Sequence, residues 1–334
     1  MKVLFLSLLS LFLIACAKPL PSATPTPLPS PVLLPKITEY INFQSLTLPG
    51  NLWSPFMPPP EDGIEVTVRG LLKIPESSGQ IPAVVIMHGC GGMGSGDVAW
   101  EARLNEMGIA SFSVYSLGSR GIFEMCSGNA QINIASVLTD AYRALDVLAE
   151  HPRIEASRIA ILGLSFGGRT ALWVNHIRFQ ERYATGQNQF AAHLAFYPAS
   201  CYIQLADETA VTDKPMRIFH GSRDNWTPIE QCQAYVDRLQ QAGVDIVLYE
   251  YPDALHSFDN PNLPFLEIPS ALTPGNCNFI EQNGQIIDPE TGQEPTVNSA
   301  CVRKGVVTGY NAEAERQATA DVEVFLTEVF GLKE

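Results

Sequence analysis

A regular alternation of short apolar runs and amphipathic helical segments constrains the fold of this chain more than any other feature. Ala83–Met87 is a continuous apolar run, as expected of a strand covered on both faces. Ile132–Glu150 carries its apolar side chains on one stripe, as expected of an amphipathic helix. Further strands are predicted at Ile64–Ile74, Ile109–Tyr115, Arg158–Leu164, Phe190–Phe196, Met216–His220 and Asp245–Tyr251, and further helices at Asp97–Met107, Phe166–His176, Pro228–Gln241 and Asn311–Val329. This order predicts an α/β fold, in which a mostly parallel central sheet has helices on both faces.

Residues 259–310 interrupt this rhythm, because they are rich in Pro, Asn and Gly. An irregular segment of that length is unusual in a compact domain unless it is cross-linked or functional. It holds Cys277 and Cys301, and a disulfide between them would close it. We therefore expect residues 37–334 to form a single domain with an irregular, Cys-containing insertion at about 259–310.

The N-terminal residues are typical of an export signal. Met1–Cys16 holds one Lys and then an apolar run too short to span a bilayer comfortably. The run ends in Leu13-Ile14-Ala15-Cys16, which resembles the cleavage box of bacterial lipoproteins. This resemblance implies a signal peptide at 1–15, a lipid anchor on Cys16 and a Pro-rich extended tether at 16–36. The protein would then be exported and lipid-anchored in a bacterial cell envelope. The alternative is an ordinary signal peptide or an anchor helix with an incidental Cys.

Charge and cysteine content exclude several function classes. The formal net charge of −14, without a basic run, argues against nucleic-acid binding and against electrostatic docking on anionic lipid. Beyond Cys16 the chain has six Cys, which an oxidising compartment would pair, although fifteen pairings are possible and free buried thiols are the alternative. There is no C-x-x-C and no other metal-ligand spacing, so no metal site is expected.

The segment Gly163-Leu164-Ser165-Phe166-Gly167 lies between a predicted strand and a predicted helix. A strand that turns sharply into a helix needs small neighbours, and the two glycines let that turn close. The Ser165 hydroxyl would then stand exposed at the carboxyl edge of the sheet. Because a hydroxyl is a weak nucleophile near neutral pH, Ser165 needs a base, and the base needs an orienting acid.

Asp224 and His256 are the candidates for acid and base. Each follows a predicted strand, and parallel strands present their carboxyl ends at the same edge of a sheet. The chain order Ser, Asp, His is the one that accompanies this type of turn. A turn or cap role for Asp224, and a surface position for His256, are the alternatives. Asp253 is nearer to His256 in sequence but shares its loop, which makes it the weaker acid candidate.

A glycine-rich segment, His88-Gly89-Cys90-Gly91-Gly92, follows the strand Ala83–Met87. Hydrolysis through a serine needs two fixed donors for the oxyanion of the tetrahedral intermediate. We expect one donor to be the backbone N–H of Phe166 and the other to be that of Cys90 or Gly91. The alternative is that these glycines only form a tight turn.

With these motifs the chain resembles the α/β-hydrolase superfamily and, within it, the dienelactone hydrolase-like family. The likeness rests on VVIMHGCGGM, RIAILGLSFGG, AFYPASC, GSRDNWTPIEQC and ALHSFDNP. It implies that Ser165, Asp224 and His256 are nucleophile, acid and base. Because related sequences carry cysteines at similar places, it also implies the disulfides Cys90–Cys126 and Cys201–Cys232.

The chain also departs from that family. The founding members use a Cys nucleophile where this chain has Ser165, so their substrate is not carried over. Arg120 lies in an Arg-Gly pair that relatives often have, but Tyr115 stands where they usually have an acidic residue. Arg120 either binds a substrate carboxylate or forms a structural ion pair. Trp226 and residues 93–97, 115–126 and 259–310 are expected to contribute to the substrate pocket.

The predicted function is therefore cleavage of a small carboxylic ester or lactone through an acyl-enzyme intermediate, without a cofactor. Two alternatives stay open: an acyl-peptidase with the same three residues, and a non-catalytic envelope protein that binds ligands on a hydrolase fold.

Overall fold

The computed structural model describes residues 36–52, 54–127 and 132–332, and these residues form one compact unit. The expected signal peptide, Cys16 and nearly all of the tether lie outside the described residues. Within those ranges, no helix is both long enough and apolar enough to cross a membrane.

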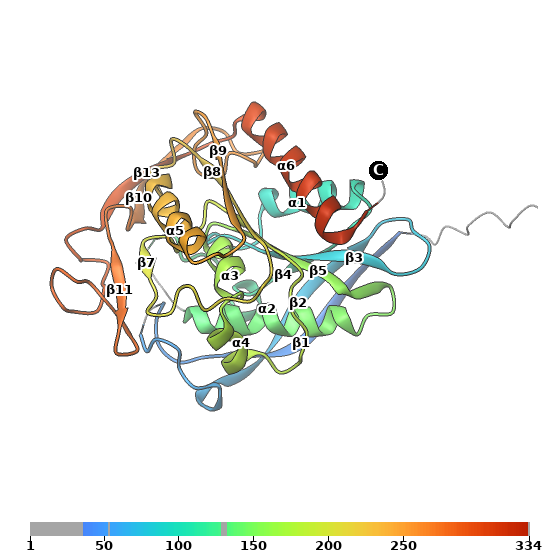
Figure 1. Ribbon diagram of the computed structural model, residues 1–334, viewed down its shortest axis with the longest axis horizontal. Coiled ribbons are helices and arrows are strands. Elements are labelled where there is room, and N and C mark those ends of the chain that lie inside the picture. The colour runs from blue at the N-terminus through green and yellow to red at the C-terminus, as the bar shows by residue number, and fades with distance from the viewer. Residues whose placement is uncertain (1–35, 53, 128–131, 333–334) are drawn as a thin grey trace, which may run out of the picture. The chain divides into compact units, whose positions relative to one another are not determined.

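An eight-stranded sheet forms the centre of the unit, and its strand order is β1-β2-β4-β3-β5-β6-β8-β9 (Figure 1). Strands β4, β3, β5, β6, β8 and β9 run parallel, whereas β1 and β2 pair antiparallel at one edge and β2 pairs antiparallel with β4. The strands are β1 (Ile37–Thr47), β2 (Ile64–Ile74), β3 (Ile81–Met87), β4 (Ala110–Val114), β5 (Ile154–Leu164), β6 (His193–Phe196), β8 (Met216–Gly221) and β9 (Ile246–Tyr251). The α/β prediction with a mostly parallel sheet is confirmed.

Two apolar cores cover the two faces of the sheet, because successive side chains of a strand point to opposite faces. In β3, Val85 belongs to one core, whereas Val84 and Ile86 belong to the other. The first core includes residues of α2 (Ile134–Ala149), α3 (Phe166–Trp173), α4 (Ile177–Tyr183) and α5 (Ile229–Gln241), and the second includes residues of α1 (Ser95–Glu106) and α6 (Ala312–Phe330). Every residue of β3 is buried, as its continuous apolar run predicts.

Some element boundaries differ from the sequence-based expectation. The side chain of Asn133 caps α2 by accepting a hydrogen bond from Ala135 N. Gly94, not Asp97, is the N-cap of α1, and the Asp97 side chain accepts from the N–H of Gly94. The predicted helix Phe166–His176 ends at Trp173, and α4 follows it as a separate short helix.

Residues 259–310 are less irregular than predicted, because short strands lie between their loops and turns. They contain β10 (Leu266–Thr273) and β13 (Arg303–Thr308), which pair antiparallel, and the hairpin of β11 (Phe279–Gln282) and β12 (Gln285–Ile287). Strand β11 also pairs in parallel with β7 (Ile203–Gln204), which follows β6. These strands are short, and β10 and β13 pair across about thirty residues of intervening chain, so no local periodicity reveals the pairing.

Candidate active site

Ser165 lies at the sharp turn between β5 and α3. Its φ of 53° and ψ of −105° are rare for a residue with a side chain and mark a strained turn. A Cβ atom on Gly163 would overlap the backbone of Gly167, and one on Gly167 would overlap the carbonyl of Met87. Both glycines are therefore required for the close packing of this turn, as the sequence pattern predicts.

The structure brings Ser165, His256 and Asp224 together at the carboxyl edge of the sheet. The hydroxyl of Ser165 donates to Nε2 of His256 across 3.0 Å. On the other side of the ring, Nδ1–H of His256 donates to Oδ2 of Asp224 across 2.7 Å. The three residues follow β5, β9 and β8, which are parallel, so their loops leave the sheet at the same edge. This is the arrangement that the chain order predicts.

The carboxylate of Asp224 is held by several donors besides His256. Its Oδ1 accepts from the N–H groups of Trp226 at 2.8 Å and Thr227 at 2.9 Å, and its Oδ2 lies 2.9 Å from the Thr227 hydroxyl. Burial raises the pKa of Asp224, but the charge and hydrogen bond of His256, helped by His220, outweigh it and the net shift is downward. Asp224 is therefore ionised beside the imidazole and stabilises its protonated form.

The weaker acid candidate, Asp253, is not placed for this role. Its side chain is 82% exposed and lies 3.9 Å from Arg223, also on the surface. The ring of His256, by contrast, is buried and contacts the rings of Tyr197 and Trp226, whose centroids lie 4.5 and 4.8 Å from it. These two rings fix the orientation of the imidazole.

The glycine-rich segment after β3 adjoins the nucleophile. A Cβ atom on Gly89 would lie 3.8 Å from the Cβ of Ser165, so the backbone passes close to it. Phe166 is the first residue of α3, where a backbone N–H has no acceptor within the helix. Phe166 and Cys90 line the same pocket as Ser165, whereas Gly91 is not among its lining residues. Met125 N donates to Cys90 O at 2.8 Å and holds this segment.

A pocket of about 370 Å³ opens beside Ser165. That volume lies within the range of small-molecule sites. Trp226 lines the pocket, as predicted, and donates through its indole N–H to Leu272 O at 3.1 Å. Of the other segments predicted to contribute, 115–126 and 259–310 do so, whereas residues 93–97 are not among the lining residues.

Arg120 does not lie where the substrate-binding prediction needs it. Its guanidinium donates two hydrogen bonds to Asp140, at 2.8 and 2.9 Å, and others to Ser116 O and Leu46 O. Both charged side chains are buried, and Arg120 is not among the residues that line the pocket. The structure therefore corrects that prediction in favour of the structural ion pair.

Three disulfides join Cys90 to Cys126, Cys201 to Cys232 and Cys277 to Cys301. These are the pairs that the closed insertion and the family resemblance led us to expect. Cys90 and Cys126 both line the pocket, so the first disulfide ties the glycine-rich segment to the neighbouring part of the pocket lining.

The sequence analysis missed two contributions to the site. Thr227 contacts both Asp224 and the base, with its hydroxyl 3.3 Å from Nδ1 of His256. Thr308 donates through its hydroxyl to the carbonyl of His256 at 2.6 Å. Thr227 is three residues from Asp224 and could have been flagged, but nothing in the sequence links Thr308 to the site. In the part of the chain that the structure describes, no group of three or more His, Cys, Asp or Glu could hold a metal ion.

Comparison with known proteins agrees with this architecture. The sequence model described as the dienelactone hydrolase family matches residues 68–330. A dienelactone hydrolase-like promiscuous phosphotriesterase from metagenomic libraries aligns over 87% of this chain and 99% of its own, with a TM-score of 0.54 and 18% identity. A putative dienelactone hydrolase from Klebsiella pneumoniae aligns over the same shares, with a TM-score of 0.53 and 14% identity. At these identities the likeness shows the fold alone.

One curated relative, the uncharacterized peptidase YuxL of Bacillus subtilis, is 23% identical over 148 residues. The match covers 37% of this chain and 22% of the relative, so the chain spans about a fifth of that protein's length.

Proposed function

We propose that this chain, which belongs to the dienelactone hydrolase family, is a serine hydrolase that cleaves carboxylic esters or lactones through an acyl-enzyme intermediate. The observation that carries the proposal is the line of hydrogen bonds from Ser165 through His256 to Asp224, at 3.0 and 2.7 Å. Ser165 lies at a strained turn and lines a pocket, and a nucleophile needs such access to a bound substrate.

In the acylation half of the proposed reaction, Nε2 of His256 takes the Ser165 proton while Oγ attacks the ester carbonyl carbon. The backbone N–H groups of Phe166 and Cys90 stabilise the resulting oxyanion, and each such donor typically supplies about 3 kcal/mol. When the tetrahedral intermediate collapses, the bond to the alcohol oxygen breaks and His256 returns the proton to that oxygen. The acyl group then remains on Ser165.

In the deacylation half, a water molecule gives a proton to His256 and attacks the acyl-enzyme. The second tetrahedral intermediate releases the carboxylic acid, and the proton returns to Ser165. Asp224 stays ionised throughout and keeps Nδ1 of His256 protonated.

Reaction with a fluorophosphonate probe, followed by peptide mass spectrometry, tests the proposal. We expect an adduct on Ser165 in the folded protein, and neither adduct nor p-nitrophenyl acetate turnover with Ser165→Ala. Folded wild-type protein that is neither labelled nor active would point instead to a non-catalytic binding protein.

A peptidase is the second candidate, because the curated relative is named as one and the same three residues serve amide hydrolysis. Turnover of aminoacyl p-nitroanilides is compared with that of p-nitrophenyl esters on the same preparation. Amide turnover with kcat/KM equal to or above the ester value would favour the peptidase.

We also propose that Cys16 carries a lipid anchor and that the protein is exported to the bacterial envelope. The support is the sequence alone: an apolar run that ends in Leu13-Ile14-Ala15-Cys16, before a Pro-rich stretch. Radiolabelled palmitate is expected to be incorporated into the wild type but not into Cys16→Ala. Equal labelling of both would refute the anchor without affecting the hydrolase proposal.

A further inference from the structure

Residues of the segment 259–310 line the pocket beside Ser165. Seven of the nineteen described lining residues come from this segment, which we call the inserted wall: Leu272, Pro274, Phe279, Pro295, Thr296, Val297 and Val302. Six of the seven have apolar side chains. The other apolar side chains that line the pocket include Leu52, Met125, Phe166 and Trp226.

Charge in this pocket is confined to one place. Among the described lining residues only Arg169 carries a charge at neutral pH, and it is buried. Its guanidinium donates to Ala199 O and to the Tyr202 hydroxyl and lies against the ring of Phe166. An anionic group drawn into the apolar remainder of the pocket would lose its hydration there, whereas an uncharged apolar group gains from the same burial.

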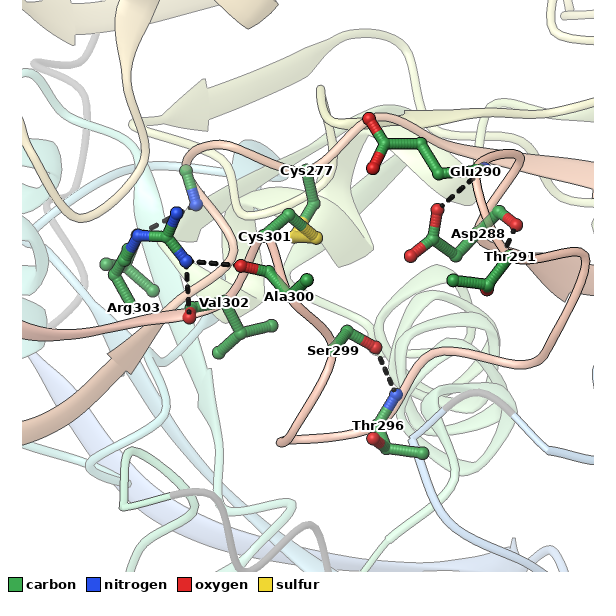
Figure 2. Close-up of a disulfide and its surroundings, with 12 residues drawn as sticks. Cys277, Asp288, Glu290, Thr291, Thr296, Ser299, Ala300, Cys301, Val302 and Arg303 are labelled. Carbon is green, nitrogen blue, oxygen red and sulfur yellow. Dashed lines mark hydrogen bonds between the residues drawn. A yellow bond between two sulfur atoms is a disulfide. The ribbon is translucent and has the colours of Figure 1, made fainter.

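The inserted wall is cross-linked by a disulfide and hydrogen-bonded to α5. The Cys277–Cys301 disulfide joins its two ends, and Val302 follows directly after the bridge (Figure 2). The side chain of Gln231 on α5 donates to Gly275 O at 3.0 Å and to Cys277 O at 2.8 Å.

The rim of the same wall is ordered by its own hydrogen bonds. Within residues 296–299, Thr296 N donates to the Ser299 hydroxyl at 3.0 Å (Figure 2). Phe279 N donates to Tyr202 O at 2.8 Å, on the loop after β6. A wall fixed at so many points presents one shape to a ligand, which favours discrimination by size and polarity.

We propose that the pocket takes an uncharged, apolar acyl or alcohol group larger than acetyl, and that the inserted wall selects it. The inference rests on the proposed function, because it presumes ester hydrolysis at Ser165. A volume of about 370 Å³ fits a ring or a chain of several carbons, and a bare acetyl group leaves most of it unfilled.

Two ester series measured on the full chain test the substrate class. The first varies the acyl group of p-nitrophenyl esters from acetate to hexanoate, with benzoate and the anionic glutarate monoester. The second varies the alcohol of acetate esters and is followed by acid release. In the series whose variable group occupies the pocket, we expect kcat/KM to rise about three- to fourfold per added methylene. The glutarate monoester should fall at least tenfold below pentanoate. Two flat series, or a preference for the anionic ester, would overturn the proposal.

Variants test the wall. Val302→Glu places a charge in it, and Val324→Glu is the matched control, because Val324 is an exposed residue of α6. We expect Val302→Glu to lower kcat/KM at least tenfold for the preferred apolar ester and less than threefold for the shortest ester of the series whose variable group occupies the pocket, with no change in the control. Val297 is a half-exposed residue on the rim. Val297→Glu should also lower kcat/KM for the preferred apolar ester, and it replaces Val302→Glu in the test if that variant does not fold.

The outcomes separate the two proposals. If wild-type protein shows neither Ser165 labelling nor acetate turnover, the proposed function fails. If it is labelled and active, but a folded wall variant keeps the wild-type ester preference, the hydrolase stands and the role of the inserted wall is refuted.

Discussion

The hydroxyl of Thr308 donates a 2.6 Å hydrogen bond to the main-chain carbonyl of His256, and both residues are buried. Gly309 N donates to the same carbonyl at 3.2 Å. Just before Thr308 on β13, Val307 N donates to Asn225 Oδ1 in the loop of the acid. One strand of the insertion thus braces the loops of both base and acid.

Replacement of Thr308 by Val should therefore act on catalysis more than on substrate binding. Loss of the bond to His256 O frees the loop to shift, and small displacements of a catalytic group are costly. We expect kcat for p-nitrophenyl butyrate to fall about tenfold, with KM changed less than twofold. Thr308→Ser should restore most of the rate, and Thr319→Val, which removes a hydroxyl on α6, should have no effect. A loss confined to thermal stability would contradict the positioning role.

Replacement of Asp224 by Asn should abolish most of the activity while the fold is retained. The amide can no longer hold the proton on Nδ1 of His256 or stabilise the imidazolium, and equivalent changes cost roughly three to four orders of magnitude in kcat. The kcat of the variant is measured by stopped assays on protein whose circular dichroism spectrum matches that of the wild type. Asp253→Asn is the control. If Asp253→Asn were the more damaging change, the assignment of the acid would be wrong.

Asp97 should make the stability of the protein depend on pH. Burial raises the pKa of Asp97 to about 7, with the nearby Asp259 and Glu101 adding to the rise and hydrogen bonds from the Gly94 and Asp97 backbones opposing it. Between its ordinary value of 3.8 and about 7, the folded state keeps a proton that the unfolded state has lost. Stability is therefore lost as pH rises through this window, by about 1.4 kcal/mol for each unit of pKa difference.

Asp97→Asn removes this dependence, because an amide stays neutral and can still accept from Gly94 N. We expect the variant to raise Tm at pH 8 and to change it little at pH 4.5, by scanning calorimetry. Asp253→Asn, at an exposed carboxylate, should shift Tm by the same small amount at both pH values. If the Tm difference between Asp97→Asn and the wild type were the same at both pH values, the raised pKa of Asp97 would be contradicted.

Arg120→Ala should destabilise the protein without weakening substrate binding. It leaves the buried carboxylate of Asp140 without its partner, and breaking a buried pair in this way typically costs about 3–5 kcal/mol. Urea unfolding measures the loss, and KM is determined on protein whose active sites have been titrated. Arg223→Ala, at an exposed position, is the control. A raised KM at unchanged stability would instead restore Arg120 as a substrate ligand.

The sequence determined those features that depend on neighbouring residues. The apolar run of β3 and the stripe of α2 predict the parallel sheet and its helical cover, because burial on two faces or on one leaves a local period. Gly163 and Gly167 predict the sharp turn at Ser165, since the steric conflict that they avoid lies within a few residues. The order of Ser165, Asp224 and His256 then needs only parallel strands to bring the three residues to one edge.

The tertiary structure alone decided which of the polar candidates meet. Arg120 pairs with Asp140 and does not reach the pocket, and Thr308 contacts His256 from 52 residues away. Such contacts depend on the register and path of segments that are distant along the chain. The free energy that brings them together comes from the burial of whole elements, and it leaves no periodic signal at the residues that finally touch.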